Sequence, residues 1–190
     1  MASAQEQRRL TSKGDTAFAN MEKVNCELFV MTYGAMVIQL IKDIGDVDKV
    51  NARLESMGYN IGTRLIDEFL SKAQIKRCKS FQDTAELIAR VGFKMFLGIE
   101  GQIKSWDDDT KFYLDLANNP LNDFVELPPH FKGKLHYANI LCGIIRGALE
   151  MIQLRVTCTY TKSVLNGDDI DQIKVCLEEV LEDVFADDDD

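Results

Sequence analysis

Apolar residues recur along the chain at characteristic spacings, and each spacing predicts a kind of element. Between residues 47 and 69 they return every three or four positions, which is the period of an amphipathic helix. From about residue 25 to 44 they occupy nearly every face, which predicts a helix packed on several sides. A third periodic stretch follows Ser80, whose side chain is suited to cap a helix start, and ends at Gly98.

The C-terminal half combines one further helix with extended segments. Residues 135–153 are almost entirely apolar and predict the central helix of the core. Residues 154–161 alternate with period two, a turn signal follows at Asn166-Gly167, and alternation resumes at 173–177, which predicts an antiparallel hairpin. Short extended segments are also expected at residues 103–106, 111–116 and 123–127. The pattern therefore predicts an α+β fold of four main helices and a small antiparallel sheet that includes a C-terminal hairpin.

The two ends of the chain differ from this central part. Residues 1–20 are polar and are expected to form a flexible N-terminal arm. The formal net charge is −9, and eleven of the 31 acidic residues lie within 168–190. The last four residues are all aspartate, so residues 186–190 are expected to form an acidic tail. Residues 21–185 remain as a single domain. A net negative chain is not expected to bind nucleic acid.

Composition also bears on the compartment. The longest uncharged run, residues 28–41, is shorter than the ~18–20 residues that cross a bilayer, and residues 1–20 lack the apolar region of a signal peptide. The five cysteines form an odd set without a C-x-x-C pair, which favours neither a disulfide framework nor a zinc site. A reducing, cytoplasmic location is therefore expected.

Glycines interrupt the predicted helices at unusual places. Gly58 and Gly62 lie four residues apart on the second helix, and each costs ~1 kcal/mol of helix propensity relative to alanine. Two such costs in one helix indicate that another backbone or an inserted group comes close to this face. Both readings stay open from the residues alone. Gly92 interrupts the apolar surface of the third helix in the same way.

Among the cysteines, Cys78 has the most reactive setting. Arg77 and Lys79 flank it just before the helix that starts near Ser80, and both the positive charge and the helix dipole favour thiolate over thiol. With no convincing base in the sequence, such a thiol is suited to being modified, for instance acylated, and an inert loop cysteine is the alternative. The sequence has no Gly-rich phosphate loop, G-x-S-x-G or H-E-x-x-H motif, so no catalytic residue or metal site is expected.

Several blocks of sequence resemble one protein family. They are residues 57–70 (MGYNIGTRLIDEFL), the Arg77-Cys78 pair, 93–98 (FKMFLG), 119–128 (NPLNDFVELP) and 147–151 (GALEM). Their order and spacing, over roughly residues 21–185, resemble the small-subunit family of the trafficking protein particle (TRAPP) complex, in particular its acylated subunit 3 members.

This resemblance implies a core subunit, not an enzyme by itself, of a complex that tethers transport vesicles between endoplasmic reticulum and Golgi. The complex promotes nucleotide exchange on a Rab-family GTPase. The resemblance further implies an α/β-plait fold, helix-mediated dimerisation with other TRAPP small subunits, and a cytoplasmic protein peripheral to cis-Golgi and endoplasmic reticulum membranes.

The resemblance also implies a palmitate chain, thioester-linked to Cys78 beside Arg77 and held in an internal channel. We hypothesise that helical glycines leave room for this chain and that three apolar residues are among its walls: Gly34, Gly58, Gly62 and Gly92, with Val37, Ile38 and Ile88. Burying about fifteen methylene or methyl groups at ~0.8 kcal/mol each gives ~12 kcal/mol, which exceeds the cost of the glycines. The alternatives are a soluble lipid carrier or sensor that uses the same channel, and a cysteine-dependent acyl-transfer enzyme.

Overall fold

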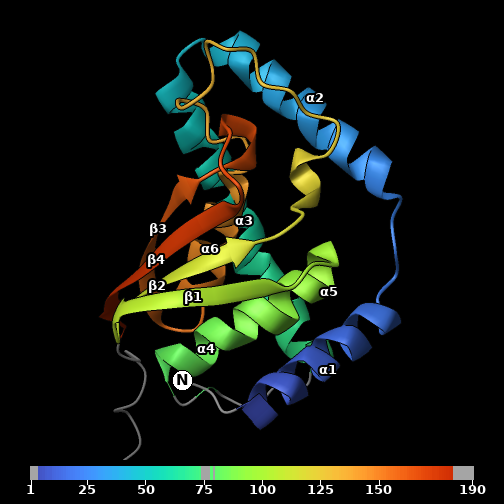
Figure 1. Ribbon diagram of the computed structural model, residues 1–190, viewed down its shortest axis with the longest axis vertical. Helices are drawn as coiled ribbons and strands as arrows, with labels where there is room; N and C mark the ends of the chain where they lie inside the picture. The colour runs from blue at the N-terminus through green and yellow to red at the C-terminus, as the bar shows by residue number, and fades with distance from the viewer. Residues whose placement is uncertain (1–3, 74–77, 79, 182–190) are drawn as a thin grey trace, which may run out of the picture.

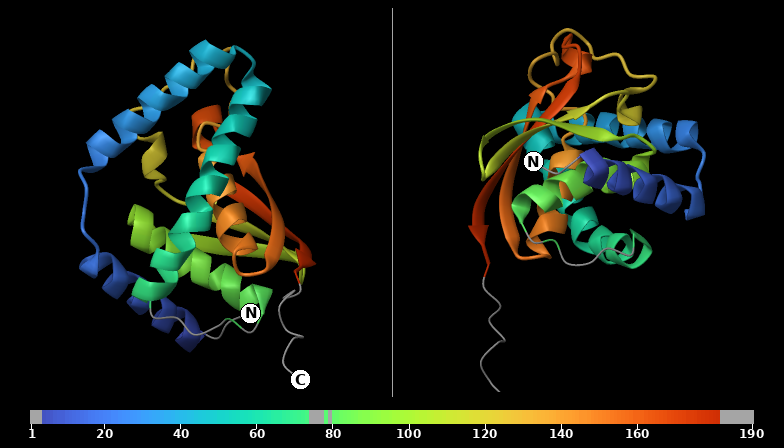
Figure 2. Two further views of the ribbon diagram at one scale, coloured as in Figure 1. Left: turned by 180° about the vertical axis from the view of Figure 1, so that it is seen from behind. Right: turned by 60° about the horizontal axis from the view of Figure 1, so that its bottom comes forward.

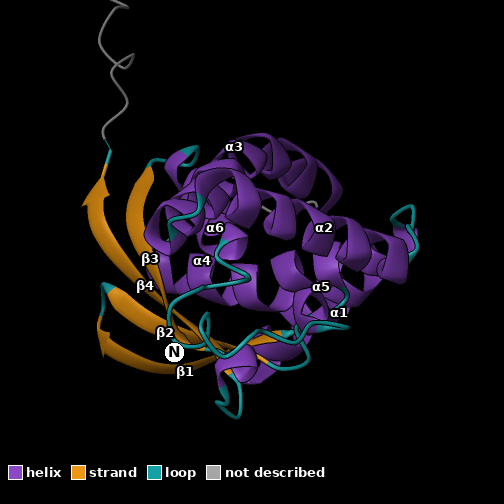
Figure 3. Ribbon diagram, turned by 90° about the horizontal axis from the view of Figure 1, so that it is seen from above, coloured by secondary structure: helices purple, strands orange, loops and turns teal. Residues whose placement is uncertain are grey.

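The computed structural model describes residues 4–73, 78 and 80–181. It is an α+β structure in which an antiparallel sheet forms one layer and α3, α4 and α6 lie on one side of it (Figure 3). The helices are α1 (Ala4–Asn20), α2 (Cys26–Ile44), α3 (Val47–Ala73), α4 (Phe81–Leu87), the π-helical turn η1 (Ile88–Gly92), α5 (Phe93–Leu97) and α6 (Ile140–Glu150). The strands are β1 (Gly101–Asp108), β2 (Lys111–Leu116), β3 (Leu154–Lys162) and β4 (Asp171–Val180). The predicted fold class is confirmed.

Local signals explain where the long helices begin and end. The Asn25 side chain accepts a hydrogen bond from the Leu28 N–H at 2.8 Å and so caps α2. Gly45 ends α2 with a φ of 73°, a left-handed conformation that glycine adopts without strain. The Asp46 carboxylate then accepts a hydrogen bond from the Lys49 N–H at 3.0 Å at the start of α3. As Figure 1 shows, α2 crosses above the body of the protein and α3 descends from it.

The sheet has strand order β1-β2-β4-β3, with every neighbouring pair antiparallel. The expected C-terminal hairpin is the β3–β4 pair, and residues 103–106 and 111–116 lie within β1 and β2. Residues 123–127, in contrast, are not a strand. Phe124 has a φ of 61°, which interrupts any extended run, and the preceding short helix η2 (Pro120–Asn122) turns the chain.

A buried carboxylate holds this turn in place. Asp171, which is fully buried, accepts hydrogen bonds from the side-chain amides of Asn119 at 2.8 Å and Asn122 at 2.6 Å, and from the Val164 N–H at 2.9 Å. Three N–H donors satisfy the carboxylate oxygens, so the burial of Asp171 does not leave its hydrogen-bond acceptors unpaired. The asparagines that precede residue 123 are thereby tied to β4, which favours a turn over an additional strand.

Two predicted helices differ from their expected extent. The helix expected from Ser80 to Gly98 is divided by the π-helical turn η1, in which the hydrogen bonds skip one residue further than in an α-helix. The central helix expected at residues 135–153 begins only at Ile140. The chain before it contains Pro128-Pro129 and a left-handed Gly133 with a φ of 73°, and it forms successive turns instead of helix.

The predicted flexible arm is wrong for residues 4–20. These residues form α1, which lies against η1 and α5 at the lower edge of the molecule (Figure 2). Leu10 and Ala17 of α1, with Met21 just after the helix, pack against a small second core, although the segment as a whole is polar. A low average hydrophobicity therefore concealed a narrow apolar face that suffices for docking.

Candidate functional site

A cavity of about 1220 Å³ lies between α3 and the α4–η1–α5 segment. It exceeds the roughly 300–1,000 Å³ of ordinary small-molecule sites. Its walls are predominantly apolar, and much of α3's periodic stripe faces it: Met57, Ile61, Leu65 and Phe69. The same stripe continues into the main core through Val50 and Leu54, so one helix face serves both regions.

Cys78 lies at this cavity, just before α4. The Ser80 hydroxyl accepts a hydrogen bond from the Asp83 N–H at 3.1 Å and caps α4, and the Thr84 hydroxyl donates to the Ser80 carbonyl at 3.0 Å. These contacts fix the first turn of the short helix beside the thiol. All five cysteines are within the described residues, and of these only Cys78 lines the cavity.

The acidity of Cys78 differs from the expectation. Burial disfavours the charged thiolate and raises the pKa of this half-buried thiol. A hydrogen bond with the Thr84 side chain lowers the pKa, and the negative charge of Asp83 raises it, with burial the largest of the three influences. The prediction of a stabilised thiolate is therefore wrong in direction for the described surroundings. Arg77 and Lys79, on which that prediction relied, both lie outside the described residues.

Two of the other residues proposed for the channel do line the cavity. Ile88 and Gly92 lie at opposite ends of the π-helical turn η1 and both contribute to the wall. A Cβ atom at Gly92 would meet one neighbour within 4 Å, a ring carbon of Phe69 at 3.9 Å. The absent side chain thus leaves open space inside the cavity, in a π-helical turn of the kind often found at functional sites.

Gly58 and Gly62 do not line the cavity. A Cβ atom on either residue would lie 2.0 or 2.2 Å from a carbonyl oxygen of α6, closer than any real contact. Gly143 and Gly147 of α6 make the reciprocal approach to carbonyl oxygens of α3, also at 2.0 and 2.3 Å. Of the two readings that the sequence left open, close helix–helix packing is the correct one, and the proposed role in the channel is wrong.

The three channel residues proposed on α2 are also wrong. Val37 is buried in the main core, and a Cβ atom at Gly34 would lie 3.2 Å from the Tyr137 hydroxyl. Ile38 is 56% exposed at the surface. Because α2 is apolar on nearly every face, its sequence does not distinguish the side that borders the cavity, which consists of Phe29, Thr32, Tyr33 and Met36.

Several residues of the wall were not anticipated. The aromatic rings of Phe69, Phe93 and Phe96 line the cavity, and Ile144 and Ala148 form the part of its wall that belongs to α6. Their periodic spacing was visible in the sequence, but periodicity identifies a buried face without showing that a cavity lies against it. Within residues 4–73, 78 and 80–181, no group of side chains could hold a metal ion, and no helix has the length and apolar character to cross a membrane.

The family model for transport protein particle (TRAPP) components matches residues 29–176. Trafficking protein particle complex subunit 3 from Dictyostelium discoideum is 57% identical over 173 residues, which cover 90% of this chain and 93% of that protein. Subunit bet3 from Schizosaccharomyces pombe is 49% identical, covering 88% and 92% of the two chains.

A solved structure agrees with these relatives. Subunit 3 of the same complex from Naegleria fowleri, covalently bound to palmitic acid, superposes with a TM-score of 0.82 at 53% identity. The match covers 85% of this chain and all of that one. Sequence blocks, family model, relatives and fold therefore agree: the chain belongs to the TRAPP component family, groups with its subunit 3 members, and is a subunit of that vesicle-trafficking complex.

Proposed function

We propose that Cys78 carries a palmitoyl chain as a thioester and that the apolar cavity holds this chain. The observation that supports this most directly is the position of a single cysteine at the edge of a large apolar cavity. The Naegleria fowleri relative, which is covalently bound to palmitic acid, supports the same chemistry. In the modification, the Cys78 sulfur bonds to the carbonyl carbon of an acyl thioester donor, and the donor's thiol leaves with the cysteine proton.

Burial of the acyl chain in the cavity would contribute a large share of the free energy of folding. About fifteen methylene or methyl groups removed from water give ~12 kcal/mol, comparable to the whole stability of a typical domain. Because burial raises the pKa of Cys78, the free thiol is mostly protonated at neutral pH and attacks the acyl donor slowly. Once formed, the thioester is shielded from water by the same burial.

The acylated chain serves, in this proposal, as a structural subunit in transport between endoplasmic reticulum and Golgi. It contributes shape and partner surfaces to the complex that promotes nucleotide exchange on a Rab-family GTPase, and it has no turnover of its own. It is placed at the cytoplasmic side of cis-Golgi and endoplasmic reticulum membranes as a peripheral component.

An exposed apolar seam on α2 is the surface that we assign to a related TRAPP subunit. Its residues recur within α2 at steps of three, four and three, the spacing of a coiled-coil seam: Leu28, Met31, Ala35 and Ile38. Val24, which is also exposed, lies just before the helix. Leu28 and Met31 are 68% and 67% exposed. Contiguous apolar surface left in contact with water is unfavourable and is typical of an interaction site. A partner helix laid along this seam would remove that surface from water.

Intact-mass spectrometry of the protein purified from eukaryotic cells tests the acylation. We expect an added palmitoyl mass that hydroxylamine removes, that is absent from Cys78→Ser, and that persists in Cys26→Ser, which changes an exposed cysteine away from the cavity. Lipid that co-purifies but separates on denaturation would favour the carrier or sensor instead. Sustained thioester turnover lost in Cys78→Ser would favour an acyl-transfer enzyme.

Affinity purification tests the assembly. We expect stoichiometric recovery of other TRAPP subunits with the unchanged chain, and loss of at least one of them with the double variant Met31→Asp, Ile38→Asp. Glu27→Ala, an exposed change off the seam, serves as the control. Recovery of the unchanged chain alone would contradict the proposed role.

A further inference from the structure

The π-helical turn η1 has the cavity on one side and α1 on the other. Ile88 and Gly92 face the cavity, whereas Arg90 in the same turn faces α1. In Figure 2, α1 lies along the outside of the α4–η1–α5 segment, and its packing on η1 and α5 dominates its contacts with the rest of the protein. A movement of α1 therefore changes the packing around η1, which forms part of the cavity wall.

The approach of α1 to η1 depends on a glycine. A Cβ atom at Gly14 would lie 2.5 Å from the Arg90 carbonyl oxygen and 3.3 Å from the Lys94 Cβ. The first of these is a backbone atom, which cannot rotate away as the end of a side chain can. The docked position of α1 is thus compatible with glycine at position 14 and not with a larger residue.

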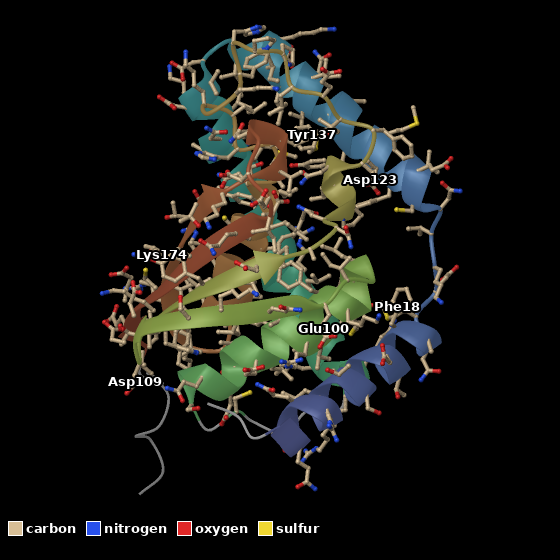
Figure 4. The ribbon with its side chains drawn as sticks, viewed as in Figure 1. Phe18, Glu100, Asp109, Asp123, Tyr137 and Lys174 are labelled. Carbon is tan, nitrogen blue, oxygen red and sulfur yellow. The ribbon has the colours of Figure 1, made fainter. Side chains whose placement is uncertain are left out.

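Polar contacts with charged groups hold α1 in this position. The Arg90 guanidinium bridges Glu86 at 2.8 Å and Glu100 at 2.7 Å, and the Thr11 hydroxyl of α1 donates to the same Glu100 oxygen atom at 2.7 Å. Asp15 pairs with Lys94 at 3.4 Å. Figure 4 shows Glu100 opposite α1, with Phe18 further along that helix.

The apolar part of the contact is small and close to the acylation site. Ala17 is the buried apolar side chain that α1 contributes, with Leu10 and Met21 partly buried. They pack against the second core, which also includes Phe69 and contacts Cys78. An element held by so little apolar surface has a low free energy of local opening compared with the main core.

From this geometry we infer that α1 is a detachable strap that keeps the η1 wall closed over the acyl chain. When α1 is docked, η1 is confined between the strap and the chain, and the thioester at Cys78 is sheltered. When α1 detaches, the π-helical turn loses its outer support, and the chain and its thioester become accessible for loading or removal. The acyl-chain part of this inference rests on the proposed function, whereas the confinement of η1 by α1 does not.

The variant Gly14→Val tests the strap without changing any residue of the cavity. Valine has a higher helix propensity than glycine, so loss of docking cannot be attributed to a weaker helix. Ala19→Val, an exposed change on the same helix, is the matched control. We expect hydroxylamine to remove the acyl group roughly tenfold faster from Gly14→Val than from the unchanged protein, with the control unaffected.

Amide hydrogen exchange of residues 81–97 provides the second readout, in the acyl-free Cys78→Ser background. We expect faster exchange in η1 when Gly14→Val is added, and no change with Ala19→Val. If the protein carries no acyl group at all, the proposed function fails while this exchange experiment still decides whether α1 supports η1. Unchanged exchange across η1 in a variant whose α1 amides have become unprotected would overturn the inference.

Discussion

Two regions of this protein use helical glycines in opposite physical roles. At the crossing of α3 and α6, a Cβ atom on any of the four glycines would lie 2.0 to 2.3 Å from a backbone oxygen of the other helix. At η1, a Cβ atom on Gly92 would meet a single ring carbon at 3.9 Å. The first region uses missing side chains to bring two backbones together, and the second uses one to leave a cavity open.

The pairing of the glycines distinguishes the two cases. Gly58 and Gly62 on α3 are matched by Gly143 and Gly147 on α6, both pairs at a four-residue spacing that places them on one face. Gly92 has no such counterpart. Matched glycine pairs on two helices thus accompany backbone contact between them, whereas the unmatched Gly92 leaves room in the cavity wall. An unmatched glycine is not sufficient for this, because a Cβ atom at Gly34 would lie 3.2 Å from the Tyr137 hydroxyl.

The largest effect that would test this contrast is on folding stability. Gly143→Ala places a Cβ atom 2.0 Å from the Glu55 carbonyl oxygen, so α3 and α6 must separate. We expect the free energy of unfolding to fall by about 3 kcal/mol, which for a chain of this size lowers the melting temperature by roughly 6–12 °C. Thermal unfolding followed by circular dichroism measures it.

The same substitution at the other region is the matched control. At Gly92 the backbone is right-handed helical and the new methyl group has space, so Gly92→Ala should leave the melting temperature unchanged or slightly raised. Equal losses of stability at positions 92 and 143 would show that the two regions do not differ as described.

A smaller effect on stability, but a large one on acylation, is expected for Gly92→Leu. Because the Cβ atom at this position meets only a ring carbon of Phe69, we expect the leucine side chain to extend into the cavity and occupy volume that we assign to the acyl chain. We expect the acyl-free protein to remain folded and the acylated fraction, measured by intact mass, to fall at least severalfold. Unchanged occupancy, with Gly92→Ala as the reference, would remove Gly92 from the channel.

The comparison also shows how far the sequence could lead. Periodicity located α2, α3 and the β3–β4 hairpin, because a buried face imposes a repeating pattern whatever lies beyond it. It could not separate Val37 from Ile38 in a helix that is apolar all round, nor show which side of α3 borders a cavity. The helix α1 and the π-helical turn depend on contacts between segments about 75 residues apart, such as that of Gly14 with Arg90, which no local pattern encodes.

The smallest of the expected effects concerns the thiol at the edge of the cavity. Sequence position alone favoured an ionised Cys78, whereas its burial raises the pKa, and the protonated form is not the nucleophile. The rate of alkylation of Cys78 in acyl-free protein, mapped by mass spectrometry, should therefore increase with pH around a midpoint above the roughly 8.5 of an exposed thiol. A short cysteine peptide in the same buffers supplies the reference.

Two variants separate the influences on that midpoint. Thr84→Val removes a hydrogen bond that lowers the pKa of Cys78 and should move the midpoint further up, whereas Asp83→Asn removes a negative charge that raises it and should move the midpoint down. Because burial is the largest influence, the midpoint should stay above that of the peptide in both variants. A midpoint below that of the peptide would instead mean that positive charge, and not the apolar cavity, dominates the surroundings of the thiol, and the cavity would then be wetter at this end than its lining indicates.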